Sequence, residues 1–316
     1  MKAAVMNALG QSPKYQEFPG PVAGENETIV NVKAAGLHPV VKARASGAHY
    51  SSDAVVPFVP GVDGVGTLED GSRVYFGVAR APFGSMAERT VIRPSMCVPL
   101  SDGIGDAQAA AIANPGMSAW ISMKVRGGLV AGETVLVMGA TGVAGQLALQ
   151  VARYLGAGRV VGVGRNVDAI AAAEVDAVIA LGQPDDAVRD KFAEEAARGI
   201  DVVIDYLWGR PTELLLEALA KGFKATSTHR TRLVEVGESA GKTIQLPGST
   251  LRAIDLTLLG SGFGSASLDV ILAAIPGLFS LAAAGTLKID VEQVPLGDVE
   301  GAWNHVEKGR RIVFTV

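Results

Sequence analysis

The sequence predicts an α/β protein with two domains, one rich in β-strands and one built on a parallel, doubly wound sheet. The chain has 316 residues, whereas single hydrophobic cores stop growing near about 250–300 residues. Short strands punctuated by Gly and Pro dominate the N-terminal part, and apolar strands alternate with helical segments after about residue 105. Such an alternation of apolar strands and helices is typical of a parallel sheet with helices on both faces.

The N-terminal part predicts a β-rich domain without a long helix. Residues 28–34 alternate between apolar and polar side chains, as expected of a half-buried strand. Shorter strands are expected at 62–68 and 72–76, joined by the turn Glu69-Asp70-Gly71. The last segment, 289–316, returns to mixed strand and helix.

The middle of the chain predicts a six-stranded sheet. Its first strand, 134–138, leads through a Gly-rich turn into a helix over 143–155. The further strands expected are 159–163, 177–180, 202–204, 231–236 and 256–259. The uncharged run 270–285 is shorter than the roughly 20 residues of a membrane span, and it predicts a buried helix with a kink or break at Pro276.

Composition excludes several classes of function. The net charge is −4 and the basic residues are scattered, whereas a nucleic-acid surface concentrates Lys and Arg. Cys97 is the only cysteine, so no disulfide can form within the chain, as is usual in a reducing cytoplasm. The first residues lack the apolar core of a signal peptide. We therefore expect a cytoplasmic protein that binds neither nucleic acid nor membrane.

The strongest chemical signal is the Gly-rich turn after residue 138. In such a motif Gly139 permits the tight turn, Gly142 lets backbone approach a pyrophosphate, and Gly145 lets the helix pack on the sheet. Three glycines alone are a weak signal, and a structural turn is the alternative. Here strand, turn, helix and second strand follow in the required order within about 30 residues, which favours a dinucleotide site. The residues expected at the pyrophosphate are Gly139, Ala140, Thr141, Gly142, Val143 and Ala144.

The end of the second strand predicts which dinucleotide binds. A site that prefers NAD places Asp or Glu there, to bind the ribose 2′-hydroxyl. This chain has Gly164, Arg165 and Asn166 instead. Arg165 can bind a 2′-phosphate through charge-assisted hydrogen bonds, each contributing about 1.5–3 kcal/mol, and Asn166 can donate one more. The alternative is a solvated surface arginine, but the missing acid and the present base both favour NADPH.

The order of these features resembles the medium-chain dehydrogenase/reductase family along essentially the whole chain. Val32 to Pro39 looks like the family's first active-site loop, and Val59 to Gly66 is similar to its Pro-Gly-x-(Asp/Glu)-x-x-Gly segment. Gly199 to Asp205 and Arg232 to Gly237 match the fourth and fifth strands of its nucleotide domain. The resemblance implies a GroES-like catalytic domain, 1–110 completed by 262–316, and a Rossmann NADP(H)-binding domain, 111–261. It also implies a homodimer formed through the strand around 256–259.

The resemblance allows zinc to be tested residue by residue. Zinc-dependent members carry a Cys at the position of His38, a His at that of Val62, and a Cys or Asp near Asn114. Catalytic zinc needs three protein ligands, and here only His38 and the neighbouring Asp63 can be counted. The four-cysteine structural zinc lobe is absent as well. The chain is therefore similar to the zinc-free quinone oxidoreductase branch, and we expect no metal.

For catalysis the resemblance implicates His38 and Tyr50. His38 stands where the branch commonly has Asn, near nicotinamide and substrate, and it could bind substrate oxygen, donate a proton or pack beside Pro39. Tyr50 is our choice for a substrate-oxygen contact, with His49 as the alternative if the alignment has a one-residue gap. An ordinary loop aromatic is the other interpretation of Tyr50. The resemblance also places Ser118, Leu207 and Gly237 at the cofactor.

The implied reaction is hydride transfer from NADPH to a quinone or an α,β-unsaturated carbonyl compound. Without a metal to polarise an alkoxide, such electrophiles fit better than alcohols, and the protein supplies orientation and electrostatics. The alternative is a non-catalytic NADPH-binding sensor or structural protein of the same fold. His38 and Trp208, which depart from the usual family residues, leave room for it.

Overall fold

A computed structural model describes residues 1–52, 55–221, 229–305 and 309–316 of the chain. Contacts divide it into two compact units: Met1–Asn114 with Leu272–Val316, and Pro115–Ile271. Both limits fall inside helices, α2 (Asp106–Trp120) and α8 (Leu268–Ala283), so no loop marks them in the sequence. The limits expected at 110/111 and 261/262 stay a prediction.

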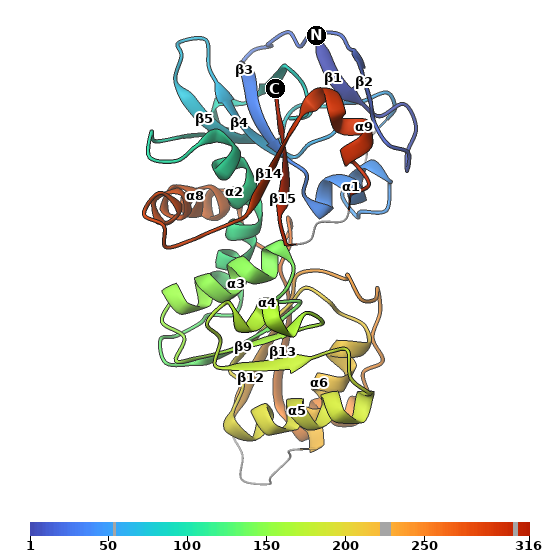
Figure 1. Ribbon diagram of the computed structural model, residues 1–316, viewed down its shortest axis with the longest axis vertical. Helices are drawn as coiled ribbons and strands as arrows, with labels where there is room; N and C mark the ends of the chain where they lie inside the picture. Colours follow the sequence, from blue (N-terminus) through green and yellow to red (C-terminus); the bar gives the residue numbers. More distant parts are fainter. Residues whose placement is uncertain (53–54, 222–228, 306–308) are drawn as a thin grey trace. The chain divides into compact units, whose positions relative to one another are not determined.

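The first unit is built on a seven-stranded mixed sheet. Its strands are β3 (Thr28–Gly36), β4 (Asp63–Thr67), β5 (Arg73–Gly77), β6 (Arg89–Ile92), β7 (Cys97–Pro99), β14 (Val291–Pro295) and β15 (Arg311–Thr315). The order is β14-β15-β3-β4-β5-β7, with β6 also paired to β3. Strand β15 pairs antiparallel with β3 and parallel with β14, so the two ends of the chain build one sheet (Figure 1). The predicted β-rich domain is confirmed.

Short elements complete this unit. They are β1 (Lys2–Val5), β2 (Lys14–Glu17), α1 (Pro39–Ala45), η1 (Pro94–Met96), η3 (Leu296–Asp298) and α9 (Val299–Ala302). Strands β1 and β2 form a separate antiparallel pair. A core cluster joins side chains from both ends of the chain, among them Val5, Leu37, Val41, Trp303 and Phe314. Burial of apolar surface therefore ties the C-terminal segment to the N-terminal one.

The second unit holds a six-stranded sheet that is parallel throughout. Its strands are β8 (Thr134–Met138), β9 (Arg159–Gly164), β10 (Ala177–Ala180), β11 (Val202–Asp205), β12 (Arg230–Glu235) and β13 (Asp255–Gly260). The order β10-β9-β8-β11-β12-β13 confirms the predicted doubly wound sheet. The strand order reverses between β8 and β11, and open sheets of this kind bind ligands beyond the carboxyl ends of the strands at such a point.

Helices cover both faces of this sheet. They are α3 (Val143–Tyr154), α4 (Val167–Ala171), α5 (Asp185–Arg198), α6 (Arg210–Lys221) and α7 (Gly248–Ala253), with a π-helical stretch, η2 (Ile121–Arg126), after α2. Figure 1 shows α3 and α4 on one side of the strands and α5 and α6 on the other. The apolar side chains of β8, β9 and β11 are buried on both faces, which explains their uninterrupted apolar sequences.

Of the kink or break predicted at Pro276, the break does not occur. Helix α8 continues through this residue to Ala283. Only Ile275, Leu278, Phe279 and Ala282 are buried, one face of the helix, so the segment is half-buried rather than buried. Pro276 is exposed, and there a missing backbone hydrogen bond is tolerated more easily than in a packed interior. Among the described residues, no helix has both the length and the apolar composition to span a bilayer.

Candidate functional site

The turn between β8 and α3 is fastened to the end of β9. The N–H groups of Gly139 and Ala140 both donate to the carbonyl oxygen of Val163, at 2.9 Å each. Gly139 has φ +86°, a left-handed conformation that favours glycine, and it turns the chain sharply off the strand. The N–H of Gly142 donates back to the Gly139 carbonyl at 3.1 Å. The backbone of the turn is therefore fixed by the sheet itself.

The three motif glycines are glycines for different structural reasons. A Cβ on Gly145 would collide with the carbonyl oxygen of Gly139, so this glycine is needed for the helix to pack against the turn. A Cβ on Gly142 would meet only that same oxygen, at 3.5 Å, an ordinary contact. Gly142 is exposed and has φ −74°, which any residue can adopt. Nothing inside the unit requires a glycine here, so Gly142 leaves space for a group from outside the chain.

The first turn of α3 is suited to an anion. The first N–H groups of an α-helix have no acceptor within the helix, and the helix dipole places positive charge there. Helix α3 has no side-chain cap and no acidic residue in its first turn. Thr141 and Ala144 are partly exposed beside the exposed Gly142. This end of the helix can therefore receive a phosphate group.

The end of β9 lies beside the same turn. Gly164 is buried, and a Cβ on it would meet the Thr141 side chain at 3.2 Å. Arg165 follows as an exposed residue, and within the described part of the chain it makes no ion pair. Asn166 caps α4, since its Oδ1 accepts the N–H of Ala169 at 3.2 Å, which leaves its amide nitrogen for other hydrogen bonds. An exposed cation and an amide donor thus stand next to the Gly-rich turn.

The loop after β11 lies beside this turn, and the loop after β12 is hydrogen-bonded to the end of β11. A Cβ on Gly139 would lie 3.2 Å from Cδ2 of Leu207. The N–H of Gly237 donates to the Asp205 carbonyl at 3.2 Å, and this glycine packs against the carbonyl of Tyr206. Burial raises the pKa of Tyr206, and the neighbouring Ser118 side chain partly offsets the effect. Of the three residues predicted for the rest of the cofactor site, Leu207 therefore lies beside the Gly-rich turn, and Ser118 and Gly237 lie beside Tyr206.

Asp205 was not among the residues predicted for the site. Its side chain is fully buried at the end of β11. Oδ1 accepts the N–H groups of Leu207 at 2.8 Å and Trp208 at 3.0 Å, and Oδ2 accepts the Thr212 hydroxyl at 2.5 Å. Burial raises the pKa of Asp205, and these three donors oppose the rise. The one available signal was an acid at the end of an otherwise apolar strand.

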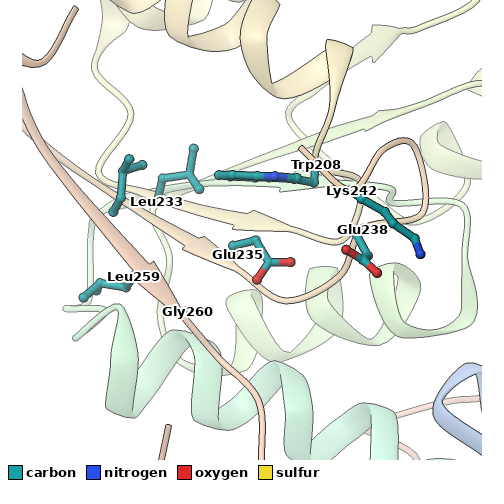
Figure 2. A pocket seen from close by; sticks show the side chains of 8 residues that line it. Trp208, Leu233, Glu235, Glu238, Lys242, Leu259 and Gly260 are labelled. Atoms are coloured by element: carbon teal, nitrogen blue, oxygen red, sulfur yellow. The ribbon is translucent and has the colours of Figure 1, made fainter. Parts of the chain in front are cut away.

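Trp208 points into a cavity of about 380 Å³ (Figure 2). The other lining residues are Leu233, Glu235, Glu238, Lys242, Leu258, Leu259 and Gly260. The pKa of Glu235 is raised by partial burial and by the negative charges of Asp205 and Glu238. Trp208 has φ +54°, uncommon for a bulky residue, while Leu207 beside it contacts Gly139. The indole ring thus lines this cavity, whereas Tyr206 and Leu207 of the same loop lie beside the Gly-rich turn.

His38 lies in a buried polar cluster of the first unit. It precedes α1 and is 0% exposed, with Nε2 3.3 Å from Oδ1 of Asp63. The Tyr75 hydroxyl donates to Oδ2 of Asp63 at 2.8 Å. Burial, together with the Asp63 charge, raises the pKa of Tyr75 well above its ordinary value, so this hydroxyl stays protonated. Within the described residues neither ring nitrogen of His38 has a hydrogen-bond partner, and neither does Oδ1 of Asp63, an arrangement that buried side chains rarely keep without a function or a bound ligand.

Tyr50 has a different environment from His38. Its side chain is 74% exposed, and the ring stacks on His49 with the centroids 4.1 Å apart. His49 is less exposed and contacts the Ser51 hydroxyl through Nδ1 at 2.8 Å. The two residues predicted for catalysis are therefore one buried imidazole and one exposed phenol. Their catalytic roles stay predictions.

The donor set around His38 does not suit zinc. Val62 offers no donor atom, and Asn114 stands where the zinc-dependent proteins have Cys or Asp. Over the described ranges, no three His, Cys, Asp or Glu side chains come together in a way that could hold a metal ion. His38 and Asp63 alone fall short of the three protein ligands of a catalytic zinc site.

Comparison with known proteins gives consistent relatives over the whole chain. No model of a known protein family matches it. A probable NADPH-dependent quinone reductase of Emericella nidulans is 27% identical, and the alignment covers 96% of each chain. The quinone oxidoreductase of Thermus thermophilus, solved also in complex with NADPH, is 27% identical, with a TM-score of 0.81 over 100% of both chains. A quinone oxidoreductase of Pseudomonas syringae shares the fold, with a TM-score of 0.85 at 22% identity over 100% of this chain and 99% of that one.

Proposed function

Because the chain belongs to the medium-chain dehydrogenase/reductase superfamily, in its zinc-free quinone oxidoreductase branch, we propose that it reduces quinones or α,β-unsaturated carbonyl compounds with NADPH. The observation that carries this proposal is the turn between β8 and α3. It offers N–H groups and open space at Gly142, and the exposed Arg165 follows the neighbouring strand. The similarity to an NADPH-dependent quinone reductase over 96% of the chain supports the same cofactor.

The residues present fit NADPH. The first turn of α3, from Gly142 to Ala144, would hold the pyrophosphate. Arg165 and the amide nitrogen of Asn166 would bind the 2′-phosphate, since a guanidinium and an amide donor replace the acid of an NAD site. Ser118, Leu207 and Gly237 would line the rest of the cofactor site. When bound, NADPH supplies the hydride, which is the chemistry that no side chain can provide.

The chain's own task is to stabilise negative charge on the substrate oxygen and to provide a proton. His38 is the side chain we assign to this task, because both of its buried ring nitrogens lack a hydrogen-bond partner and Nε2 faces the Asp63 carboxylate at 3.3 Å. Because the Asp63 carboxylate faces Nε2, Nδ1 is the ring nitrogen left to face a substrate. Tyr75 occupies the other oxygen of Asp63, so that Oδ1 is left for His38. The proton leaves Nδ1 for the substrate oxygen and is replaced from solvent.

Tyr50 is a second candidate for contact with substrate oxygen. Its exposed hydroxyl can act only from the surface of the first unit, whereas His38 acts from its interior. Replacement by Phe separates the two assignments, because it removes one hydroxyl and leaves the stacked ring in place. A Tyr50→Phe variant with unchanged kcat and KM would leave His38 as the only assigned donor.

Two further features are part of the proposal. Strand β13 ends the sheet order, so one of its edges has no strand partner within the described residues, and Leu258 on it is 37% exposed. Such an edge is a template for pairing with another strand, which supports a homodimer formed through β13.

The single cysteine, partly buried and unpaired, supports a cytoplasmic location.

Binding and turnover are tested separately. Calorimetry of the apoprotein with NADPH and NADH should show heat with NADPH and binding at least about tenfold weaker with NADH. The absorbance of reduced nicotinamide is then followed with a panel of quinones, enones and enals. NADPH binding without oxidation by any member of the panel would favour the non-catalytic alternative. No heat with either coenzyme would contradict the proposal.

A further inference from the structure

Asp205 connects the strand that ends beside the Gly-rich turn with the loop that contacts it. Its backbone carbonyl accepts the N–H groups of Val236 at 2.8 Å and Gly237 at 3.2 Å, which ties the loop after β12 to the end of β11. Its carboxylate accepts the N–H groups of the second and third residues that follow it. This pattern of side-chain acceptance is a local turn, and it fixes the backbone of the loop from 206 to 208.

The direction of three successive side chains follows from that turn. Tyr206 lies beside Ser118, Leu207 contacts Gly139, and Trp208 points into the cavity next to Leu233 (Figure 2). Trp208 keeps a left-handed φ of +54°, a conformation that a bulky residue holds only when its surroundings impose it. The hydrogen bond from its N–H to Asp205 is one such constraint.

The carboxylate is an expensive group to bury for a purely structural turn. A buried charge needs compensation, and Asp205 receives it from two N–H groups and one hydroxyl. Hydrogen bonds to a charged acceptor are about twice as strong as neutral ones. They hold the loop more firmly than an uncharged turn would.

From these contacts we infer that Asp205 is a positioning residue of the coenzyme site, which acts by holding Leu207 against Gly139. The inference rests on the proposed function, because it assigns a role in coenzyme binding to a side chain that does not touch the coenzyme. Loss of the carboxylate frees the loop, Leu207 no longer supports the turn, and the N–H groups of the turn lose their fixed direction. Pre-organisation of this kind determines affinity without adding a contact.

The test compares three variants of the full chain by NADPH calorimetry and thermal unfolding. Asp205→Ala removes the carboxylate that accepts the N–H groups of Leu207 and Trp208 and the Thr212 hydroxyl. It should raise the Kd for NADPH tenfold or more. Asp205→Asn can still accept from Leu207 and Trp208 and donate to the Thr212 oxygen, so it should restore the Kd to within threefold of wild type. Thr212→Val removes only the hydroxyl, so it should lower Tm and leave the Kd within twofold.

Hydrogen exchange of the peptide that covers 205–209 is the second readout. We expect fast exchange at this peptide in Asp205→Ala and slow exchange in Asp205→Asn and Thr212→Val. Should Asp205→Ala fail to fold, Leu207→Ala tests the same link and should raise the Kd several-fold. Its control is Trp208→Phe, on the side of the loop that faces the cavity, which should leave the Kd unchanged.

The outcomes separate this inference from the proposed function. A wild-type chain that does not bind NADPH would refute the proposed function itself. Wild-type binding with the same Kd in Asp205→Ala, or a Kd that rises as much in Thr212→Val as in Asp205→Ala, would refute the positioning role alone.

Discussion

The two candidate sites of this chain are built from different materials. The nucleotide site of the second unit consists mostly of backbone: the turn at Gly139, the N–H groups of α3 and a carbonyl of β9. The site of the first unit consists of side chains, His38, Asp63 and Tyr75, buried within a sheet. A backbone site depends on glycines in a fixed order and is visible in sequence. A side-chain site depends on strand register, which a single sequence does not display.

The largest effect is expected where backbone geometry has no freedom. Gly145→Val should collide with the Gly139 carbonyl, and overpacking of this kind costs about 1–3 kcal/mol. At the upper end this corresponds to a Kd for NADPH raised about a hundredfold, with a lower Tm. Calorimetry and thermal unfolding measure the two effects.

The matched control is Gly142→Ala, whose added Cβ has room within the unit. It should weaken NADPH binding and leave Tm unchanged, because only the coenzyme needs that space. If Gly142→Ala destabilises the fold as much as Gly145→Val, the glycines have one structural role and the comparison between the two sites fails.

The second effect concerns the side-chain site. His38→Leu removes the proposed proton donor, and kcat should fall about a hundredfold, as for loss of a general acid. The Kd for NADPH should stay within twofold of wild type, because the binding residues lie in the other unit. Steady-state kinetics with a quinone and an enone, alongside calorimetry, check both parts. An unchanged kcat would remove His38 from catalysis and leave Asp63 and Tyr75 a structural cluster.

The third effect tests the charged side chain that we propose for the 2′-phosphate. Arg165→Ala removes a charge-assisted hydrogen bond and should raise the Kd for NADPH about tenfold or more while leaving that for NADH nearly unchanged. Equal losses for the two coenzymes would show that Arg165 does not bind the 2′-phosphate. Arg153, a surface arginine on α3 that pairs with Asp176, is the control position, and its replacement should leave the preference for NADPH unchanged.

The smallest effect is a dependence of stability on pH. The pKa of Glu235 is raised in the folded chain, so the folded state holds its proton at a pH where the unfolded state has released it. The unfolded state then binds fewer protons, and stability falls as pH rises from the ordinary glutamate pKa through the raised one. Glu235→Gln should remove this loss. Above that pH interval the variant should have a higher Tm than wild type. A change of 1 kcal/mol in the free energy of unfolding shifts Tm by about 2–4 °C, and we expect less than that because the Glu235 side chain is half-buried. A Tm difference that is independent of pH would contradict the assignment.

Sequence reasoning was strongest where local pattern and tertiary structure agree. Strands β8 and β10 have the predicted bounds, and the other four strands of their sheet differ from prediction by one residue at one or both ends. The central strands β8, β9 and β11 are largely apolar because helices cover both faces of the sheet. The Gly-rich turn follows β8 as predicted, since φ at Gly139 and the space at Gly145 permit no other residue.

The failures have physical causes. Tyr75 meets Asp63 because the β4–β5 register pairs it with Val65 and places Asp63 diagonally beside it. No periodicity in the sequence reveals that register. Asp205 ends a strand that reads as apolar, and only the structure shows which N–H groups it accepts. At Pro276 the general rule for proline predicted a kink or break, but the helix is not broken at this exposed position.

Strand β15 also determines when the first unit can be completed. It lies between β14 and β3 in the sheet, so the edge of β3 that it covers stays open until Arg311–Thr315 has left the ribosome. The whole nucleotide-binding unit is synthesised in that interval and can form its parallel sheet first. Removing Arg311–Val316 would therefore leave the second unit able to fold. In the first unit it would leave β3 and β14 without the strand that pairs with both of them.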